Sequence, residues 1–238
     1  MAHVIRESAE PKIVPARKTW DDEYRTHQVI PSSTRAQPSK PLLLFSELLR
    51  YEERRVVLDA GSGPGRNAIY LAGKGCLVYA LDFSEAALSE LRRAALAAGV
   101  NERVLVNSAS LEEPLPFPDD SFDLALDSYV SCHFTEESLK QHYFGELRRV
   151  LKPSGVLFSS QFSVEDEYYR ALIKEEQSSP IIVTDPNNGI TKQLYTEAEA
   201  KGYFSKHFGL RYFAKFEFED MVLGRPYRRS ILTLVLEK

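Results

Sequence analysis

The sequence contains few of the residues that hold small secreted or metal-binding proteins together. Only 2 cysteines occur among its 238 residues, Cys76 and Cys132. Two are too few for a disulfide framework in a chain of this size, so we expect reduced thiols. Cys132 precedes His133 directly, but no second pair of metal ligands follows at a suitable spacing. No metal site is therefore predicted.

The chain also lacks a basic excess and a long apolar run. Its formal net charge is −4, whereas binding to a phosphate backbone requires a positively charged surface. A nucleic-acid partner is therefore disfavoured. No apolar run approaches the length of a membrane span, and residues 1–10 lack the charged-then-apolar order of a signal peptide. We expect a cytoplasmic protein without membrane association, either a monomer or a homodimer.

The length and apolar content set the number of domains. With 43% hydrophobic residues, the chain can form one large core but is short for two domains. Residues 1–40 carry charges, prolines and a Ser–Ser–Thr cluster, which predict an arm with little regular structure that can act as a lid. We expect residues 41–238 to form the single domain, with an amphipathic helix after Pro41.

Apolar strands and helices alternate between residues 55 and 161. Near-continuous apolar strands separated by helices predict an α/β fold with a doubly wound parallel sheet. Residues 164–207 interrupt this alternation and form an insertion, and two long strands then predict a C-terminal antiparallel hairpin. The predicted strands are 55–60, 76–81, 103–107, 122–128, 155–161, 210–219 and 228–237. The predicted helices are 66–74, 84–98 and 136–151.

Three glycines on alternate positions, Gly61, Gly63 and Gly65, follow the first predicted strand. Glycines are needed where the backbone takes positive φ or where a ligand approaches main-chain atoms, and the helix that follows offers free N–H groups. The second strand ends at Asp82, where an open α/β sheet places an acceptor for ribose hydroxyls. The ligand is therefore predicted to be a nucleoside.

The glycine spacing distinguishes between nucleoside cofactors. Counted from Gly63, the dinucleotide fingerprint G-x-G-x-x-G requires a glycine where Arg66 stands, which argues against a nicotinamide-dependent dehydrogenase. The pattern D-x-G-x-G-x-G from Asp59 instead resembles motif I of the class I S-adenosylmethionine-dependent methyltransferases. Residues 82–83, 114–123 and 147–155 resemble later motifs of that family in the same order. The chain is similar to the type 11/12 methyltransferases.

A weaker resemblance covers residues 65–72 and the last strand, which look like the tellurite-resistance and thiopurine methyltransferases. The family resemblance implies a Rossmann-like, seven-stranded sheet, mostly parallel, that the C-terminal hairpin closes. It also implies S-adenosyl-L-methionine as cofactor and methyl transfer to a small-molecule acceptor by in-line displacement. The insertion at 164–207 is expected to cover the acceptor site with Tyr168, Tyr169, Tyr195 and Tyr203.

The resemblance also assigns cofactor contacts. Asp59 corresponds to the acid near the methionine amino group, Asp82 to the ribose acid and Phe83 to the apolar residue beside adenine. Ser108 stands where the family has an acid, which weakens any assignment of a contact to the exocyclic amine of adenine. The predicted cofactor-binding residues are Asp59, Ala60, Gly61, Gly63, Gly65, Arg66, Asn67, Asp82, Phe83, Ser108, Ala109, Ser110, Asp127, Ser128, Tyr24 and Arg35.

The fourth strand ends at residues 127–130, which read Asp-Ser-Tyr-Val. Several methyltransferases that act on the exocyclic nitrogen of bases or on glutamine amides carry an Asn/Asp-Pro-Pro-Tyr/Phe motif at this place. Both of its prolines are absent here, so we rank these two reaction types lower. His133 is the best candidate for a general base, with Tyr129 beside it; His133 as a plain loop residue stays an equal alternative. A catalytically silent S-adenosylmethionine-binding module and a protein or RNA methyltransferase also remain open.

Overall fold

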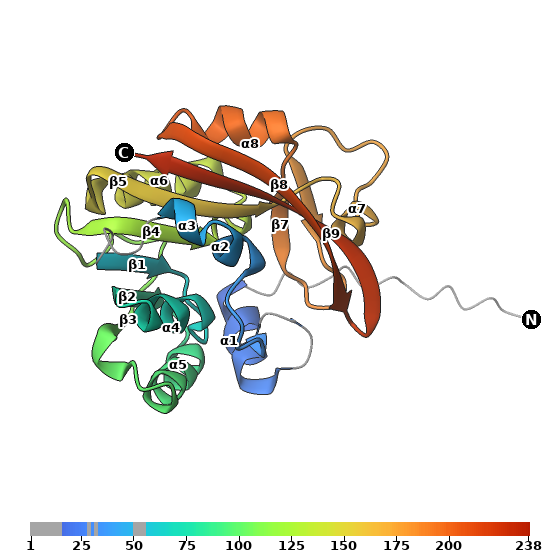
Figure 1. Cartoon of the computed structure of the whole chain (residues 1–238). Coiled ribbons are helices and arrows are strands. Elements are labelled where there is room, and N and C mark those ends of the chain that lie inside the picture. Colours follow the sequence, from blue (N-terminus) through green and yellow to red (C-terminus); the bar gives the residue numbers. More distant parts are fainter. Residues whose placement is uncertain (1–15, 28–29, 31–32, 50–55) are drawn as a thin grey trace, which may run out of the picture.

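The computed structural model describes residues 16–27, 30, 33–49 and 56–238. A seven-stranded sheet in the order β3-β2-β1-β4-β5-β9-β8 crosses the molecule (Figure 1). β1 to β5 are parallel, and β9 runs antiparallel to both β5 and β8. This confirms the predicted α/β fold. The strands are β1 (Val56–Ala60), β2 (Leu77–Asp82), β3 (Val104–Ser108), β4 (Phe122–Ser128), β5 (Leu151–Phe162), β8 (Gly209–Val222) and β9 (Arg225–Glu237).

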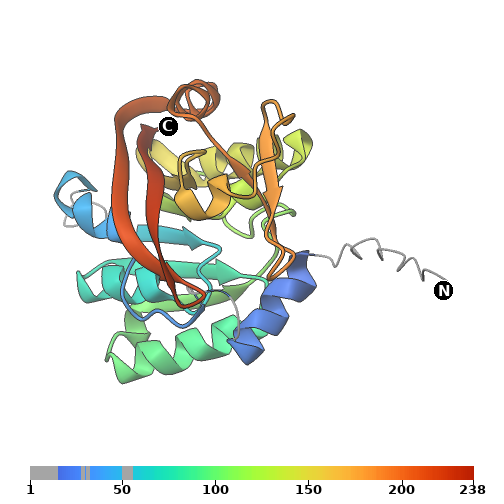
Figure 2. The same ribbon diagram turned by 90° about the vertical axis from the view of Figure 1, so that its right-hand side faces the viewer.

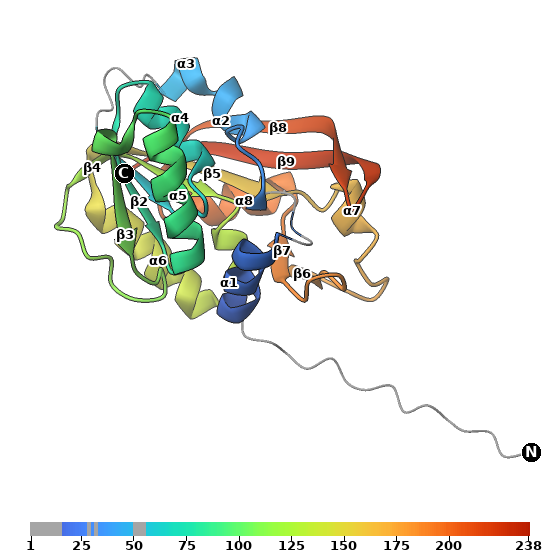
Figure 3. The same ribbon diagram turned by 90° about the horizontal axis from the view of Figure 1, so that it is seen from below.

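Helices cover both faces of the sheet, because side chains of the buried strands alternate between two cores. Val57 joins the core under α4 (Arg66–Gly73) and α5 (Glu85–Ala97), while Leu58 joins the core under α6 (Glu137–Val150) and α8 (Glu197–Phe204). Figure 3 shows α4 and α5 on one side of the strands and α6 on the other. Short 3-10 turns, Asn101–Arg103 and Ser131–His133, complete the connections.

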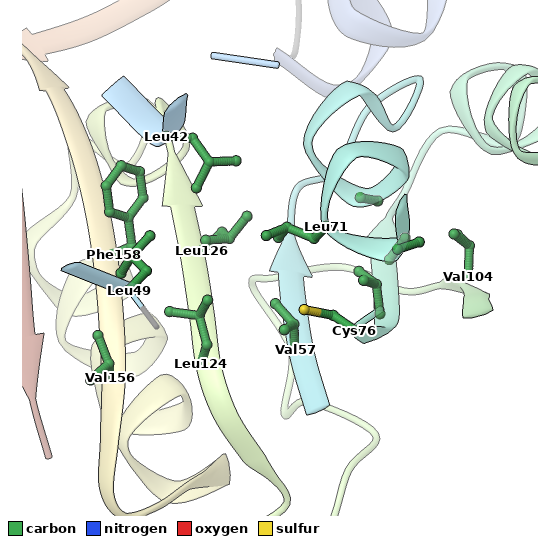
Figure 4. Packing of buried hydrophobic residues seen from close by; sticks show 14 of the residues in the cluster. Leu42, Leu49, Val57, Leu71, Cys76, Val104, Leu124, Leu126, Val156 and Phe158 are labelled. Carbon is green, nitrogen blue, oxygen red and sulfur yellow. The ribbon is translucent and has the colours of Figure 1, made fainter. Parts of the chain in front are cut away.

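The segment after Pro41 forms two short helices where the sequence predicted one. α2 (Lys40–Leu44) and α3 (Ser46–Leu49) meet at Phe45, whose ring packs against Phe158 and Phe216 at centroid distances of 5.9 and 5.4 Å. Leu42 and Leu49 fill the same core (Figure 4). Tertiary contacts with the face of the sheet therefore override the uninterrupted helical pattern.

The N-terminal arm is more regular than the sequence predicted. Residues 16–26 form a helix, α1 (Ala16–Thr26), which lies against α5. Asp21 accepts a hydrogen bond from Ser84 at 2.6 Å, and His27 contacts Glu90 at 2.7 Å. Charged side chains that suggested an unstructured arm thus attach it to the domain. Residues 1–15, 28–29 and 31–32 of the predicted arm lie outside the described residues.

The insertion at 164–207 contains its own small fold. α7 (Glu167–Arg170) is a single turn, and β6 (Ile181–Thr184) pairs with β7 (Thr191–Leu194) in a separate antiparallel sheet. Tyr168 and Tyr169 pack with Val183 in a separate apolar cluster. Beside the insertion, β8 and β9 run together as a long, bent hairpin (Figure 2).

Candidate active site

A cavity of about 560 Å³ opens where β1, β2 and β4 end. Its wall comes from α1, the glycine turn after β1, the loop after β4, β7 and the β8–β9 hairpin. The carboxyl ends of parallel strands are where open α/β sheets bind ligands. No helix in the described part of the chain combines the length and apolar composition that a membrane crossing requires.

The glycine turn has the conformation that its sequence requires. Gly61, Gly63 and Gly65 have φ of 70°, 54° and 87°, a region that L side chains rarely adopt. A Cβ at Gly65 would lie 1.9 Å from Leu91 Cδ1 in α5. The helix packs closely at Gly65 and not at Arg66, where the dinucleotide fingerprint would have put a third glycine. Arg66 is thereby left to line the cavity.

Asp82 holds the turn from the end of β2. Its Oδ2 accepts a hydrogen bond from Gly63 N at 2.9 Å, and its Oδ1 accepts one from Ser84 N at 3.0 Å. The side chain is 5% exposed, and burial raises the pKa of its carboxyl. Each oxygen retains a lone pair, so the carboxylate can accept hydrogen bonds from the two hydroxyls of a ribose.

Asp59 and Arg66, on either side of the turn, influence each other through their charges. Asp59 is 2% exposed, and its Oδ2 has no hydrogen-bond partner among the described residues. Burial raises the pKa of this carboxyl to about 7, against the opposing effect of the Arg66 charge. The Arg66 guanidinium makes no hydrogen bond with any part of the chain that the structure describes. Within the described residues, the carboxylate of Asp59 has one oxygen without a partner and the guanidinium of Arg66 has no hydrogen bond, and two such groups fit the ammonium and carboxylate of an amino acid.

The other end of the cavity is aromatic. Tyr129 has a φ of 64° and stacks on Phe162 with ring centroids 4.9 Å apart. His133 donates from Nδ1 to the carbonyl of Thr191 at 3.1 Å, since a carbonyl can only accept. Burial and the nearby Lys192 charge lower the pKa of His133 to about 3. The imidazole is therefore neutral at physiological pH, with its lone pair on Nε2.

The structure brings most of the predicted site residues to this cavity. Those that line it are Gly61, Gly63, Arg66, Asn67, Asp82, Phe83, Ser110, Ser128, Tyr24, Arg35, Tyr129 and His133. Those that do not line it are Asp59, Ala60, Gly65, Ser108, Ala109 and Asp127. Ser108 is exposed at the end of β3, and Ala109 donates its N–H to the Asp82 carbonyl at 3.1 Å.

Asp127 belongs to the interior of the fold. It is fully buried and accepts hydrogen bonds from Ser131, Ser159 and Gln161 at 2.6 to 2.9 Å. These donors occupy the carboxylate, so it is not directed at the cavity. Asp127 therefore orders the loop after β4, which carries Tyr129.

Sequence reasoning missed several cavity residues. Of the four tyrosines expected over the acceptor, only Tyr169 lines the cavity; Tyr195 is buried in the core, and Tyr203 donates to Glu137. Among the lining residues that were not assigned individually are Trp20, Phe162, Lys192, Phe218, Asp220 and Arg229. One pattern in the sequence could have indicated Arg229. It lies two residues before Ile231 in β9, so both side chains are on the same face of the strand, and both line the cavity.

Comparisons with known proteins agree with this geometry. A family model described as a methyltransferase domain matches residues 57–155. A demethylmenaquinone methyltransferase of Clavibacter sepedonicus is 38% identical over 107 residues, which cover 45% of this chain and 41% of that protein. This chain thus spans less than half the length of that relative.

Solved structures resemble a larger part of the chain. A methyltransferase from Methanosarcina mazei matches with a TM-score of 0.68 at 22% identity, covering 85% of this chain and 98% of that one. The 1,6-didemethyltoxoflavin-N1-methyltransferase of Burkholderia thailandensis, solved with S-adenosylhomocysteine, matches with a TM-score of 0.65 at 19% identity, covering 97% and 93%. At these identities the likeness shows the fold alone. Together with the matched domain, it identifies residues 57–155 as a methyltransferase domain of the class I S-adenosylmethionine-dependent type.

Proposed function

We propose that the chain transfers the methyl group of S-adenosylmethionine to a small-molecule acceptor. The observation that carries this proposal is the division of one cavity into two ends. The glycine turn, Asp82 and Arg66 form one end, with Asp59 buried behind the turn, and aromatic side chains form the other. A nucleoside cofactor and a flat acceptor therefore fit side by side. The two free, buried thiols suit an enzyme of the cytoplasm.

Each part of the cofactor has a candidate partner. Asp82 would accept hydrogen bonds from the ribose hydroxyls, and the orphaned Oδ2 of Asp59 would accept one from the ammonium. Arg35, the sequence-based choice for the carboxylate, already forms a two-pronged ion pair with Asp220, both contacts at 2.8 Å. We therefore assign the carboxylate to Arg66, whose guanidinium is free to form such a pair.

The cofactor supplies a methyl carbon on a positively charged sulfur: an acceptor lone pair forms the new bond to carbon while the carbon–sulfur electron pair leaves with the sulfur. The protein has to align the two molecules and exclude water. Alignment alone can lower the activation barrier by about 7 to 11 kcal/mol. Trp20 and Tyr24 of α1 cover the cavity in this role. If the acceptor carries a proton, the lone pair on His133 Nε2 is the candidate to take it.

Calorimetric titration with S-adenosylhomocysteine and with NAD tests the cofactor assignment. We expect binding of S-adenosylhomocysteine alone, weakened by Asp82→Ala by about 1.5 to 3 kcal/mol for each charge-assisted hydrogen bond lost. Glu102→Ala, at an exposed acid outside the cavity, is the matched control. Binding of NAD alone would overturn the proposal.

A methyl-transfer screen against thiols, chalcogen oxyanions, amines and phenols tests the reaction itself. Turnover of one of these classes, lost together with cofactor affinity in Asp82→Ala, supports the enzyme. Tight binding of S-adenosylhomocysteine without turnover of any class would favour the silent binding module instead.

A further inference from the structure

Two buried cations lie at the aromatic end of the cavity. Lys192 of β7 is 5% exposed and Arg229 of β9 is 8% exposed, and both line the cavity. They contact the same two rings. Lys192 Nζ lies 4.2 Å from the Tyr169 centroid and 5.2 Å from that of Phe162, and the Arg229 guanidinium lies 5.3 and 5.5 Å from the same centroids. The two charges thus share one small chamber, formed by Phe162, Tyr169, Lys192 and Arg229.

The described part of the chain supplies one carboxylate for these two cations. Asp166 Oδ2 accepts from Arg229 Nε at 2.7 Å and from Ser230 N at 3.1 Å. Its Oδ1 caps α7 through Tyr169 N. Lys192 Nζ donates to the Tyr169 hydroxyl at 2.6 Å and forms no ion pair with another described residue. Burying a charge is costly unless it is paired, so the chamber is short of one negative charge.

The other acids that line the cavity are Asp82, Asp220 and the exposed Glu112, and among the described residues none of them pairs with Lys192 or Arg229. Asp82 is held by main-chain donors at the cofactor end, and Asp220 pairs with Arg35. Positive charges also lie near Tyr129 in the neighbouring loop. Burial raises the pKa of Tyr129 to about 12, and the charges of Arg66, Arg229 and Arg35 oppose this rise. Asp166 is therefore the one carboxylate among the described residues that pairs with a cation of the chamber.

We propose that the methyl acceptor is an aromatic carboxylate whose negative group binds between Lys192 and Arg229. This inference rests on the proposed methyl transfer. Arg229 engages Asp166 through Nε, which leaves its two terminal amino groups to donate to the ligand. The faces of Phe162 and Tyr169 receive the ring, since concave sites lined by aromatic side chains bind flat apolar bodies. The carboxylate anchors the acceptor and completes the charge of the chamber.

Binding of acid and amide pairs tests the anchor. We would titrate benzoate, 4-hydroxybenzoate and 2-naphthoate, each against its neutral amide, into protein saturated with S-adenosylhomocysteine. The wild type should bind at least one acid about tenfold or more tightly than its amide, as expected for a charge-assisted hydrogen bond. Lys192→Met should abolish this preference. Equal affinity for every acid and its amide in the wild type would overturn the inference.

Two further variants separate charge from folding. Lys192→Arg keeps the charge and should keep the acid preference, whereas Lys174→Met removes an exposed lysine of the same insertion and should change nothing. An acid preference that survives in Lys192→Met would also overturn the inference. S-adenosylhomocysteine should bind Lys192→Met as it binds the wild type. Failure of the wild type to bind it would instead refute the proposed function.

Discussion

The indole of Trp20 packs edge-on against the imidazole of His133, with ring centroids 5.4 Å apart and planes at 81°. Trp20 also stacks on Tyr24 at 5.6 Å, and both line the cavity. The N-terminal helix therefore touches the loop that follows β4. This contact makes α1 a wall of the candidate site, and the lid function predicted from the sequence becomes testable at a single residue.

Replacing Trp20 with alanine should loosen α1. An aromatic pair contributes about 0.5 to 1.5 kcal/mol beyond its buried area, so opening of the helix should become up to about tenfold more frequent. Trypsin should then cut faster after Lys18 and Arg25. S-adenosylhomocysteine should slow this cleavage in the wild type, because the ligand would hold the closed arrangement.

Leu96→Ala, at a 67% exposed position of α5, is the matched control and should leave the cleavage rate unchanged. Cleavage that proceeds equally fast in Trp20→Ala and wild type, with or without ligand, would show that α1 is a fixed part of the domain and not a lid.

The buried acid Asp59 predicts a pH dependence. Its folded pKa of about 7 lies above the ordinary value of 3.8, so the unfolded chain loses this proton first as the pH rises. The contribution of Asp59 to stability therefore falls between about pH 4 and 7. Asp59→Asn should remove this decline, as measured by urea denaturation at a series of pH values.

Cofactor affinity should have the opposite dependence on pH. Only ionised Asp59 can pair with the ammonium of S-adenosylhomocysteine, so calorimetric affinity should increase from about pH 6 to 8 by up to tenfold per pH unit. The increase should disappear in Asp59→Asn. A wild-type affinity that stays constant over this range would contradict the assignment of Asp59 to the ammonium.

His133 should not produce an inflection in the rate near neutral pH. Its pKa is about 3 in the folded protein against the ordinary value of 6.5. Between these two pH values the ring is neutral in the folded protein and charged in the unfolded chain. Its contribution to stability is thus complete above about pH 6.5 and is lost as the pH falls toward 3. A rate profile with a limb near pH 6 that His133→Gln removes would refute the low pKa.

The size of the His133 effect reports on the acceptor. His133→Ala should preserve most of the rate if the acceptor is a thiolate or a reduced chalcogen, because little proton transfer is required. Loss of a general base should lower the rate by about 10² to 10⁴ for a hydroxyl or a protonated amine. His133→Gln, which retains a hydrogen-bonding side chain, separates proton transfer from packing against Trp20.

The order of strands and helices could be predicted because it depends on local patterns. The apolar runs, the glycines before Arg66 and the acid at position 82 lie close together in sequence, and short-range patterns carry such information. The glycine spacing alone could not show which position of the turn packs closely against the next helix. The contact that decides it involves Leu91 of the next helix, and no spacing rule within the turn reports on that partner.

The acceptor end could not be predicted in the same way. Lys192 and Arg229 lie on strands that belong to different sheets, and Trp20 comes from the N-terminal helix. Their meeting depends on how the insertion and the hairpin fold over the sheet, which is a long-range property. Asp127 illustrates the converse, since its position at the end of β4 resembled a site residue while its four donors, which are distant in sequence or lie in the next turn, bury it.

Gly65 offers a test of the turn that is independent of any ligand. A Cβ at this position combines the strain of a φ of 87° with a clash 1.9 Å from Leu91 Cδ1, so Gly65→Ala should destabilise the protein more than left-handed strain alone. Gly99→Ala is the matched control, because its φ is 68° and nothing lies within 4 Å of the added Cβ. It should cost only about 1 to 2 kcal/mol.

Truncating the clashing side chain should restore part of the loss. Leu91→Ala alone removes a fully buried leucine and should cost about 2 to 5 kcal/mol. In the double variant the alanine at 65 gains the space that Leu91 vacates, so the two free-energy changes should sum to more than the measured one by about 0.5 to 3 kcal/mol. Urea denaturation of the four proteins gives this coupling directly. Strict additivity would mean that the helices separate to accommodate the methyl group, and the close packing of α4 on α5 would then not explain the glycine.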